Sequence, residues 1–363
     1  MFVTRRAYRS GLELAVAVMA ASALTACSSS SGGAPAASGS SAAKASTLST
    51  AIDPNYDGTD KGNFKTLTEP TVKPGTAFKV GFLNTNGGQP FLLAMQKAAE
   101  AEVNKLGGSV IALDAASDPQ KQASQLSQLI GQHVNVIIGD PVVATALAPG
   151  IAEARKAGIP FVAIGTPADE TKSPIPGAVT SISQGFDYSD YATMKALAAE
   201  HPGATFATMG LSIPVDQLIF ILSRVKYWGE HFGLKFLGEV DTTGDTETGF
   251  APAASTILTR YPSVQLIVTY NDPSAVATAT TAATSGKKVA VACPNAALSI
   301  SREVLLAGRL DLVHRTPWEQ EGVQSAIAAY DVVTRQSLPM PTFINVPGYL
   351  VTPATASKAE WIQ

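Results

Sequence analysis

Local signs of catalysis are missing from this sequence of 363 residues. It has no G-x-S-x-G nucleophile motif, no G-x-x-x-x-G-K phosphate loop and no G-x-G-x-x-G run. The four histidines lie too far apart for H-E-x-x-H or another local metal motif: His133, His201, His231 and His314. The sequence therefore predicts no enzyme, no metal and no cofactor. A secreted hydrolase whose catalytic groups meet only in space stays a minor alternative.

Concentrated positive charge is missing as well. The chain has 26 basic and 29 acidic residues, which are interspersed, and no basic block follows the first ten residues. Binding to a phosphate backbone needs clustered Lys and Arg side chains, so we expect no nucleic-acid partner. The hydrophobic content of 45% instead supplies enough apolar surface for two domain-sized cores.

Cysteine is limited to two residues, Cys27 and Cys293. Cys27 ends a segment with three early arginines, an apolar run over 12–24 that is too short to span a bilayer, and the tetrapeptide Leu-Thr-Ala-Cys. This segment resembles a bacterial lipoprotein signal, which implies export and lipid on Cys27. An ordinary secretory signal is the alternative, and the choice between general and twin-arginine export stays open. With Cys27 lipidated, Cys293 has no partner for an internal disulfide.

A low-complexity stretch separates this segment from the rest of the chain. Residues 28–50 are almost wholly Ser, Ala and Gly, and carry too little apolar bulk to offset the entropy of ordering them. Residues 51–77 contain several Pro and Gly, and we expect them to drape irregularly over the first lobe. The predicted organisation therefore begins with a signal peptide over 1–26 and a flexible tether and lead-in over 27–77.

From Phe78 onward, short apolar β-rich runs alternate with segments of helical period, which is typical of α/β proteins. Unbroken apolar runs such as Val136-Ile137-Ile138 indicate parallel strands buried on both faces. A proline-rich stretch over 166–180 divides two such series. The strands are expected over 78–83, 109–113, 134–139 and 160–165, and then over 205–209, 235–240, 264–270, 288–292 and 310–314. The helices are expected over 91–106, 119–131, 144–157, 187–200, 216–232, 248–261, 273–285, 298–307 and 318–335, and a run over 343–351 closes the chain.

Several short motifs occur in a fixed order along this pattern. They are Gln89-Pro90-Phe91-Leu92, Asp114, Asp118-Pro119, Ala157-Gly158-Ile159-Pro160-Phe161-Val162, Tyr270-Asn271-Asp272 and Gly308-Arg309-Leu310. By these motifs, residues 78–352 resemble the type I periplasmic binding proteins of ABC importers, in the branch of the ribose-binding protein. The resemblance implies an α/β fold of two Rossmann-like lobes with parallel sheets, joined by a three-segment hinge, and a ligand gripped between the lobes.

The same resemblance implies where the chain crosses between lobes. The crossings are expected near 181–185, 314–318 and 345–349. The N-terminal lobe would then comprise residues 78–183 plus 318–344, and the C-terminal lobe residues 184–315 plus 345–363.

The resemblance also assigns ligand contacts. Phe91 matches an aromatic that stacks on a sugar ring, and a core position at the helix start is the alternative. Asn271 matches an amide that hydrogen-bonds the ligand, and capping of the following helix is the alternative. Arg224 matches an arginine on a helix that faces the cleft, where bidentate donation competes with a surface salt bridge. The further candidates are loop residues at strand ends and at the second crossing: Asn84, Gln89, Asp140, Thr166, Asp245, Asn295, Thr316 and Trp318. Of these, Asn84 and Gln89 suit hydroxyl groups but would also serve as helix caps.

The sequence departs from the ribose-type pattern at three places. Gly165-Thr166 stands where those members have Asp-Arg, Cys293-Pro294-Asn295 where they have an Asp, and Thr316 where they have a Gln. Two carboxylates that grip sugar hydroxyls are therefore missing, and Asp140 and Asp245 are candidates to replace them. The ligand is then a different sugar or polyol, or a less hydroxylated molecule.

These features predict a monomeric, lipid-anchored, extracytoplasmic substrate-binding protein that delivers a sugar or polyol to an ABC permease. A sensory or scavenging lipoprotein that has the same cleft but no transport partner is the main alternative.

Overall fold

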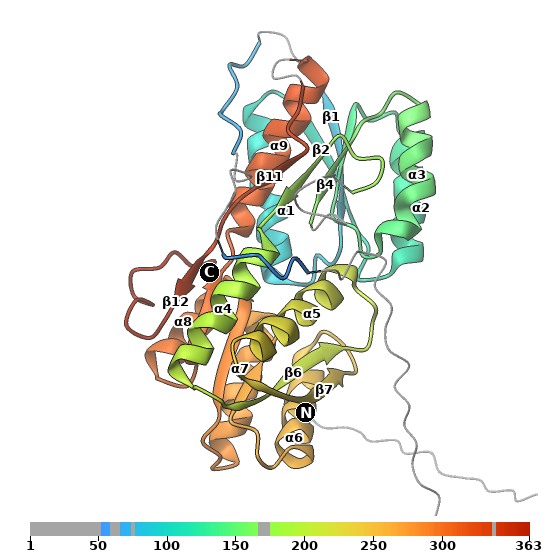
Figure 1. Cartoon of the computed structure of the whole chain (residues 1–363). Coiled ribbons are helices and arrows are strands. Elements are labelled where there is room, and N and C mark those ends of the chain that lie inside the picture. Colours follow the sequence, from blue (N-terminus) through green and yellow to red (C-terminus); the bar gives the residue numbers. More distant parts are fainter. Residues whose placement is uncertain (1–51, 59–65, 74–76, 166–174, 336–338) are drawn as a thin grey trace, which may run out of the picture. The chain divides into compact units, whose positions relative to one another are not determined.

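The first of two sheets gathers the strands of the N-terminal series (Figure 1). In the computed structural model, which describes residues 52–58, 66–73, 77–165, 175–335 and 339–363, its strand order is β11-β5-β4-β3-β1-β2 and every pairing is parallel. The strands are β1 (Lys79–Asn84), β2 (Ser109–Asp114), β3 (Val136–Gly139), β4 (Phe161–Ile164), β5 (Thr180–Ser183) and β11 (Phe343–Asn345).

Two pairs of helices cover this sheet. One face carries α1 (Pro90–Lys105) and α9 (Trp318–Thr334), and the other carries α2 (Pro119–Gly131) and α3 (Ala144–Lys156) (Figure 1). Val80 and Phe82 pack in one core cluster with α1 and α9, whereas Leu83 packs in another with α2 and α3. Successive side chains of a strand point to opposite faces, so an unbroken apolar run buries both faces of the sheet, as predicted. This sheet and its four helices form the first lobe.

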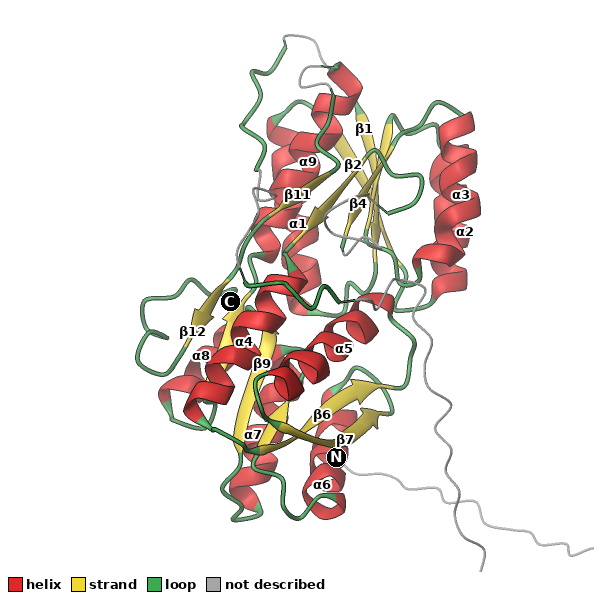
Figure 2. Cartoon of the chain, in the orientation of Figure 1, coloured by secondary structure: helices red, strands yellow, loops and turns green. Residues whose placement is uncertain are grey.

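The second lobe repeats the design with the strand order β12-β10-β9-β8-β6-β7 (Figure 2). Its strands are β6 (Thr205–Leu211), β7 (Lys235–Thr242), β8 (Leu266–Val268), β9 (Ala290–Ala296), β10 (Leu312–Arg315) and β12 (Tyr349–Val351). Only the pairing of β12 with β10 is antiparallel among the described strands. The helices α4 (Phe186–Glu200) and α5 (Asp216–His231) pack against each other, as do α6 (Glu247–Arg260), α7 (Asp272–Thr284) and α8 (Ser299–Leu306).

Two strands differ from the sequence expectation. β5 was not predicted, because Thr180-Ser181-Ile182-Ser183 is short and mostly hydroxylic, although all four residues are buried. The run predicted over 343–351 is two strands, since β11 pairs with β5 in the first sheet and β12 pairs with β10 in the second. The chain therefore passes from one lobe to the other between β11 and β12.

The lead-in contacts both lobes, which corrects the expectation that it lies on the first lobe alone. Tyr56 packs edge-on against Tyr191 of α4, with ring centroids 5.4 Å apart. Farther along, Leu67 exchanges backbone hydrogen bonds with the Gln324 carboxamide of α9, and the Lys73 amide donates to Tyr330 Oη at 2.9 Å. The described residues belong to one compact unit of the chain.

The predicted signal peptide and Cys27 lie outside the described residues. Within the described ranges, no helix is both long enough and apolar enough to cross a membrane.

Candidate ligand-binding cleft

A cavity of about 80 Å³ is lined by loops that follow strands of both lobes. It exceeds the ~10–15 Å³ that one water molecule needs. Convergence of loops at the carboxyl ends of strands is the usual location of ligand sites in open α/β sheets. The first lobe contributes Thr85, Asn86, Phe91, Leu92, Ser117, Asp140, Pro141 and Trp318, and the second contributes Leu211, Val215, Gln217, Leu218, Ile221, Asp245, Tyr270, Asn271 and Asn295.

The aromatic part of the wall comes from two helix starts. Phe91 follows Pro90 in the first turn of α1, and Trp318 begins α9. Their ring centroids lie 5.1 Å apart with planes inclined at 34°. Phe91 also belongs to the core cluster of the first lobe, as one interpretation of the sequence expected, and it lines the cavity where the other interpretation expects a stacking residue. The two rings present an aromatic surface of the kind on which an apolar CH face packs.

Asp245 connects three loops of the cleft. Its carboxylate accepts from Gln89 Nε2 at 2.6 Å, from Tyr270 Oη at 3.0 Å and from Asn271 Nδ2 at 3.0 Å. Burial raises the pKa of this carboxyl, and the three donors partly oppose the shift because they favour the charged form. Asp245 therefore joins the loop before α1 to the loops before α6 and α7.

Asp140 occupies the corresponding place in the first lobe, directly after β3. Its Oδ1 accepts from Gln217 Nε2 at 2.7 Å, and its backbone carbonyl accepts from Thr85 Oγ1 and Gln122 Nε2 at 2.6 and 2.7 Å. Burial raises the pKa of the Asp140 carboxyl to about 7, against the opposing hydrogen bonds from Thr85 and Gln217.

The two carboxyls form a reciprocal link between the lobes. Gln89 of the first lobe donates to Asp245 of the second, and Gln217 of the second lobe donates to Asp140 of the first. Gly165 makes room for the second bond, since a Cβ at that position would collide with Gln217 Nε2. Gln217 therefore lies beside the position where ribose-type members carry an Asp side chain.

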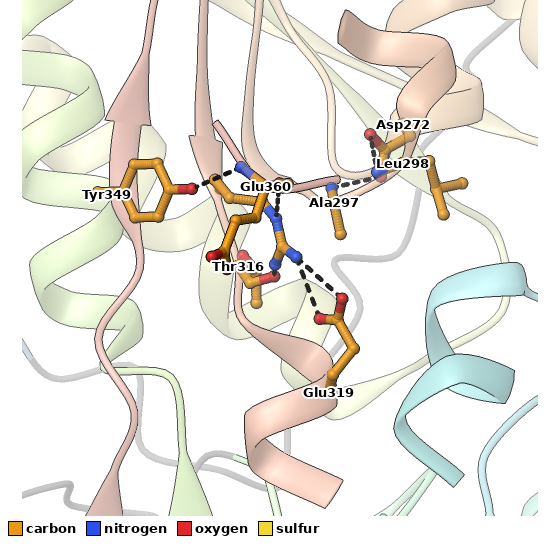
Figure 3. Close-up of polar contacts among 8 residues, drawn as sticks. Asp272, Ala297, Leu298, Thr316, Glu319, Tyr349 and Glu360 are labelled. Atoms are coloured by element: carbon orange, nitrogen blue, oxygen red, sulfur yellow. Dashed lines mark hydrogen bonds and ion pairs between the residues drawn. The ribbon is translucent and has the colours of Figure 1, made fainter. Parts of the chain in front are cut away.

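Asn271 caps α7, which is one of the two roles that the sequence allowed, and it also lines the cavity. Its Oδ1 accepts from the Ser274 amide at 3.0 Å and caps α7, while its Nδ2 donates to Asp245 and lines the cavity. The next residue, Asp272, is fully buried and accepts from the Ala297 and Leu298 amides at 2.8 and 3.0 Å (Figure 3). Asp272 thereby fixes the loop that follows Asn295.

The second crossing between lobes is held by Arg315. Its Nη2 donates to both carboxylate oxygens of Glu319 at 3.1 Å, and its Nη1 donates to the Thr316 carbonyl. Figure 3 shows Thr316 and Glu319, which both accept hydrogen bonds from the Arg315 guanidinium. The Thr316 amide donates to the Ala296 carbonyl at 2.7 Å, so Thr316 supports the crossing instead of lining the cavity.

Six of the predicted residues line the cavity: Phe91, Asp140, Asp245, Asn271, Asn295 and Trp318. Gln89 contacts Asp245 and lines a neighbouring depression. Asn84 lies behind the loop, where its Nδ2 donates to the Leu92 carbonyl and Gln96 Oε1. Thr166 lies outside the described residues.

Arg224 is not among the residues that line the cavity. Its Nε donates to Oδ1 of Asp187 in α4, and its guanidinium carbon lies 3.2 Å from the centroid of the Phe220 ring. Gln217 precedes Arg224 by seven residues, or two helical turns, which separates them by about 10 Å along the axis of α5. Only the first turns of α5 reach the cavity, and there Gln217 takes the polar position that the sequence assigned to Arg224.

Sequence reasoning missed Gln217 and the aliphatic wall of α5. No local motif marks Gln217, because its partner Asp140 is 77 residues away. The aliphatic residues are also part of an ordinary amphipathic pattern, so the pattern could not distinguish a core position from a cavity wall.

Two buried polar atoms of the cavity wall have no hydrogen-bond partner among the described residues. They are Asn295 Oδ1 and Trp318 Nε1. Unsatisfied buried acceptors and donors are rare in native proteins, and a ligand or water in the cavity can satisfy them. Metal binding has no support there, since the described residues contain no group of three or more His, Cys, Asp or Glu arranged to hold an ion.

Comparison with known proteins gives the family. The model of the periplasmic binding protein domain matches residues 80–336. The chain belongs to this family. This periplasmic binding protein also has the predicted type I fold, as solved relatives confirm.

Three such structures are similar over most of their length. A solute-binding protein from Bacillus halodurans, solved with myo-inositol, is 22% identical with a TM-score of 0.68, covering 77% of this chain and 96% of that one. A carbohydrate transporter from Acidothermus cellulolyticus, also with myo-inositol, is 18% identical with a TM-score of 0.70, covering 78% of this chain and 96% of that one. A protein from Mycobacterium smegmatis, in complex with β-D-fucofuranose, is 18% identical with a TM-score of 0.69, covering 78% of this chain and 93% of that one.

A curated relative is similar over a shorter region. The ribose import binding protein of Bacillus subtilis is 32% identical over 95 residues, which is 26% of this chain and 31% of the relative. The chain therefore matches less than a third of that protein's length.

Proposed function

We propose that the protein is the lipid-anchored substrate-binding protein of an ABC importer and binds a sugar or polyol in the cleft between its lobes. The observation that carries this proposal is the cavity itself, whose wall combines aromatic rings with polar side chains from both lobes. The solved relatives bound to myo-inositol and β-D-fucofuranose support a sugar or polyol as the class of ligand.

Closure would follow from contacts to both lobes. A ligand that touches Phe91 in the first lobe and Asn295 in the second binds the closed arrangement better than an open one, and so shifts the population toward it. A permease that recognises the closed arrangement would then receive loaded protein. Lipid on Cys27, followed by the Ser-, Ala- and Gly-rich tether, would keep the protein at the outer face of the membrane.

Thermal-shift screening of the purified protein against sugars, polyols, purines and amino acids tests the ligand class. A specific sugar or polyol raises the melting temperature in proportion to the logarithm of its concentration once it exceeds the Kd. Stabilisation by a purine or an amino acid alone would refute the sugar assignment. Mass spectrometry of the membrane-extracted protein tests the anchor, because unmodified Cys27 would contradict lipidation.

A further inference from the structure

The second-lobe wall of the cavity is aliphatic where it meets α5. Val215, Leu218 and Ile221 recur at every third residue, so neighbours in this row lie about 60° apart around the axis of the helix. Leu211, at the end of β6, lines the cavity with them. None of these four side chains can donate or accept a hydrogen bond.

The polar residue of α5 in the wall is Gln217, whose Nε2 donates to Asp140, and the other polar groups lie elsewhere. Asn295 Oδ1 and Trp318 Nε1 are the buried atoms there that lack a partner among the described residues, and the carboxyls of Asp140 and Asp245 are the acidic groups. The described part of the lining contains no Lys, Arg or His. An anionic ligand would therefore lose its hydration beside two carboxyls without gaining a cationic partner.

We propose that the cleft selects a neutral, partly deoxygenated sugar or polyol, whose hydrocarbon edge packs against the aliphatic wall formed by Leu211, Val215, Leu218 and Ile221. This inference rests on the proposed function and specifies the ligand class of the same site. A hydroxyl on that edge gives up its hydrogen bonds to water and finds no partner on the aliphatic wall, whereas a methyl or methylene group gains from burial. The difference expected of an apolar pocket is about 10- to 100-fold in affinity.

Titration calorimetry with matched pairs tests the proposal. The pairs are D-galactose with D-fucose and L-mannose with L-rhamnose, in which the second member lacks one hydroxyl, and D-galacturonate is the anionic probe. We expect the deoxy member to bind about 10- to 100-fold more tightly in at least one pair, and D-galacturonate to bind more weakly than either galactose or fucose. Equal or tighter binding of the hydroxylated member in every pair, or tight binding of galacturonate, overturns this inference and leaves the proposed function intact. Absence of binding by any sugar or polyol overturns both.

Variants of α5 test whether the preference for the deoxy sugar comes from its aliphatic wall. Leu218→Asn, a change of similar size, places an amide on the aliphatic wall and should reduce the preference for the deoxy sugar at least about fivefold. Ile219→Asn is the matched control, because Ile219 is the next residue of α5 but does not line the cavity. If Leu218→Asn does not fold, Val215→Thr makes an isosteric test at a position where Thr favours the start of a helix. An unchanged preference in the folded variant overturns the proposal.

Discussion

Buried acidic side chains are the most unusual residues of the molecule. Asp140, Asp272 and Glu321 are buried, and Asp245 is partly buried. Glu321, in the first turn of α9, has no hydrogen-bond partner for either carboxyl oxygen among the described residues. Burial raises its pKa well above the usual range, and the charges of Asp140 and Glu319 add to the shift.

Asp140 gives a prediction about pH and stability. Its folded-state pKa of about 7 lies above the usual value of about 4 for Asp, so its favourable contribution to stability is complete below about pH 4 and is lost as the pH rises through 7. Asp140→Asn cannot ionise, and should therefore be more stable than the wild type by on the order of 4 kcal/mol at pH 8 but not at pH 4. Urea unfolding across this range measures the difference. If the difference in unfolding free energy between Asp140→Asn and the wild type does not change with pH, Asp140 is not a buried carboxyl with a raised pKa. The same conclusion follows if the exposed control Glu153→Gln shows the same pH dependence.

Asn271 allows its two roles to be separated. Asn271→Ala removes both the cap of α7 and the donor to Asp245, and should cost about 1 kcal/mol of stability as well as ligand affinity. Asn271→Ser retains a good capping residue, so it should restore most of the stability without restoring the affinity. Thermal unfolding and calorimetry on the same samples provide both quantities. Recovery of affinity by Ser would show that Asn271 acts only as a cap.

How well the sequence predicts a residue depends on how local its role is. Asp118 and Asn271 were predictable caps, because the partners of a cap lie within three residues. Phe91 and Asn271 could be placed at the cleft through the resemblance, because each belongs to a motif that carries it. Gln217 could not be predicted, since its position depends on the packing of one lobe against the other. Arg224 was misplaced because the pattern gives the face of a helix but not how far along its axis the cavity extends.

At the scale of elements, α1 and α9 make the most extensive contact of any two helices that the structure describes. A Cβ on Gly322 of α9 would collide with the Met95 carbonyl and press on the Ala99 amide of α1. Helices can approach this closely only where one of them lacks a side chain. The small residue therefore sets the position of Trp318 as well, because both belong to the first turns of α9.

Gly322→Ala should destabilise the protein by about 1–3 kcal/mol, because the added methyl group forces the two backbones apart. Gly131→Ala at the end of α2 is the control, since a Cβ there meets nothing within 4 Å. This second change should be neutral or stabilising by up to about 1 kcal/mol. Chemical denaturation of both variants measures the contrast, and equal stability of the two would refute close packing at Gly322.

The sequence predicted every described helix to within one residue at each end, but strands less well. Helices such as α2 carry a Pro at the first position and a repeated apolar face, which define both ends. β5 consists of Thr and Ser at three of four positions, so its burial arises from the neighbouring strands β4 and β11 and not from its own composition. β9 extends to Ala296, through Cys293 and Pro294, because it pairs with β10 beyond the apolar run that marked it.

At the scale of the whole molecule, the described lead-in contacts both lobes. Tyr56 packs against Tyr191 and Trp228 of the second lobe, whereas the backbone of Leu67 pairs with Gln324 of the first. The described lead-in is therefore packed as part of the folded protein.

Gln324→Ala should lower the free energy of unfolding by about 1–2 kcal/mol, because it removes both hydrogen bonds to Leu67. Hydrogen exchange should show faster exchange of the Leu67 amide, while amides of the buried strand β3 are unaffected. The exposed Gln132→Ala serves as the control. Unchanged exchange at Leu67 would show that this contact does not order the lead-in.

The central claim is that one ligand is held by both lobes at the cavity between them. Calorimetry tests this claim most directly. The best sugar or polyol is titrated into the wild type, into Phe91→Leu of the first lobe and into Asn295→Ala of the second. The exposed Asn104→Ala is the control. We predict binding of one ligand per chain, a loss of about tenfold in affinity for each cleft variant and no change for Asn104→Ala. Wild-type affinity in both Phe91→Leu and Asn295→Ala would contradict the account.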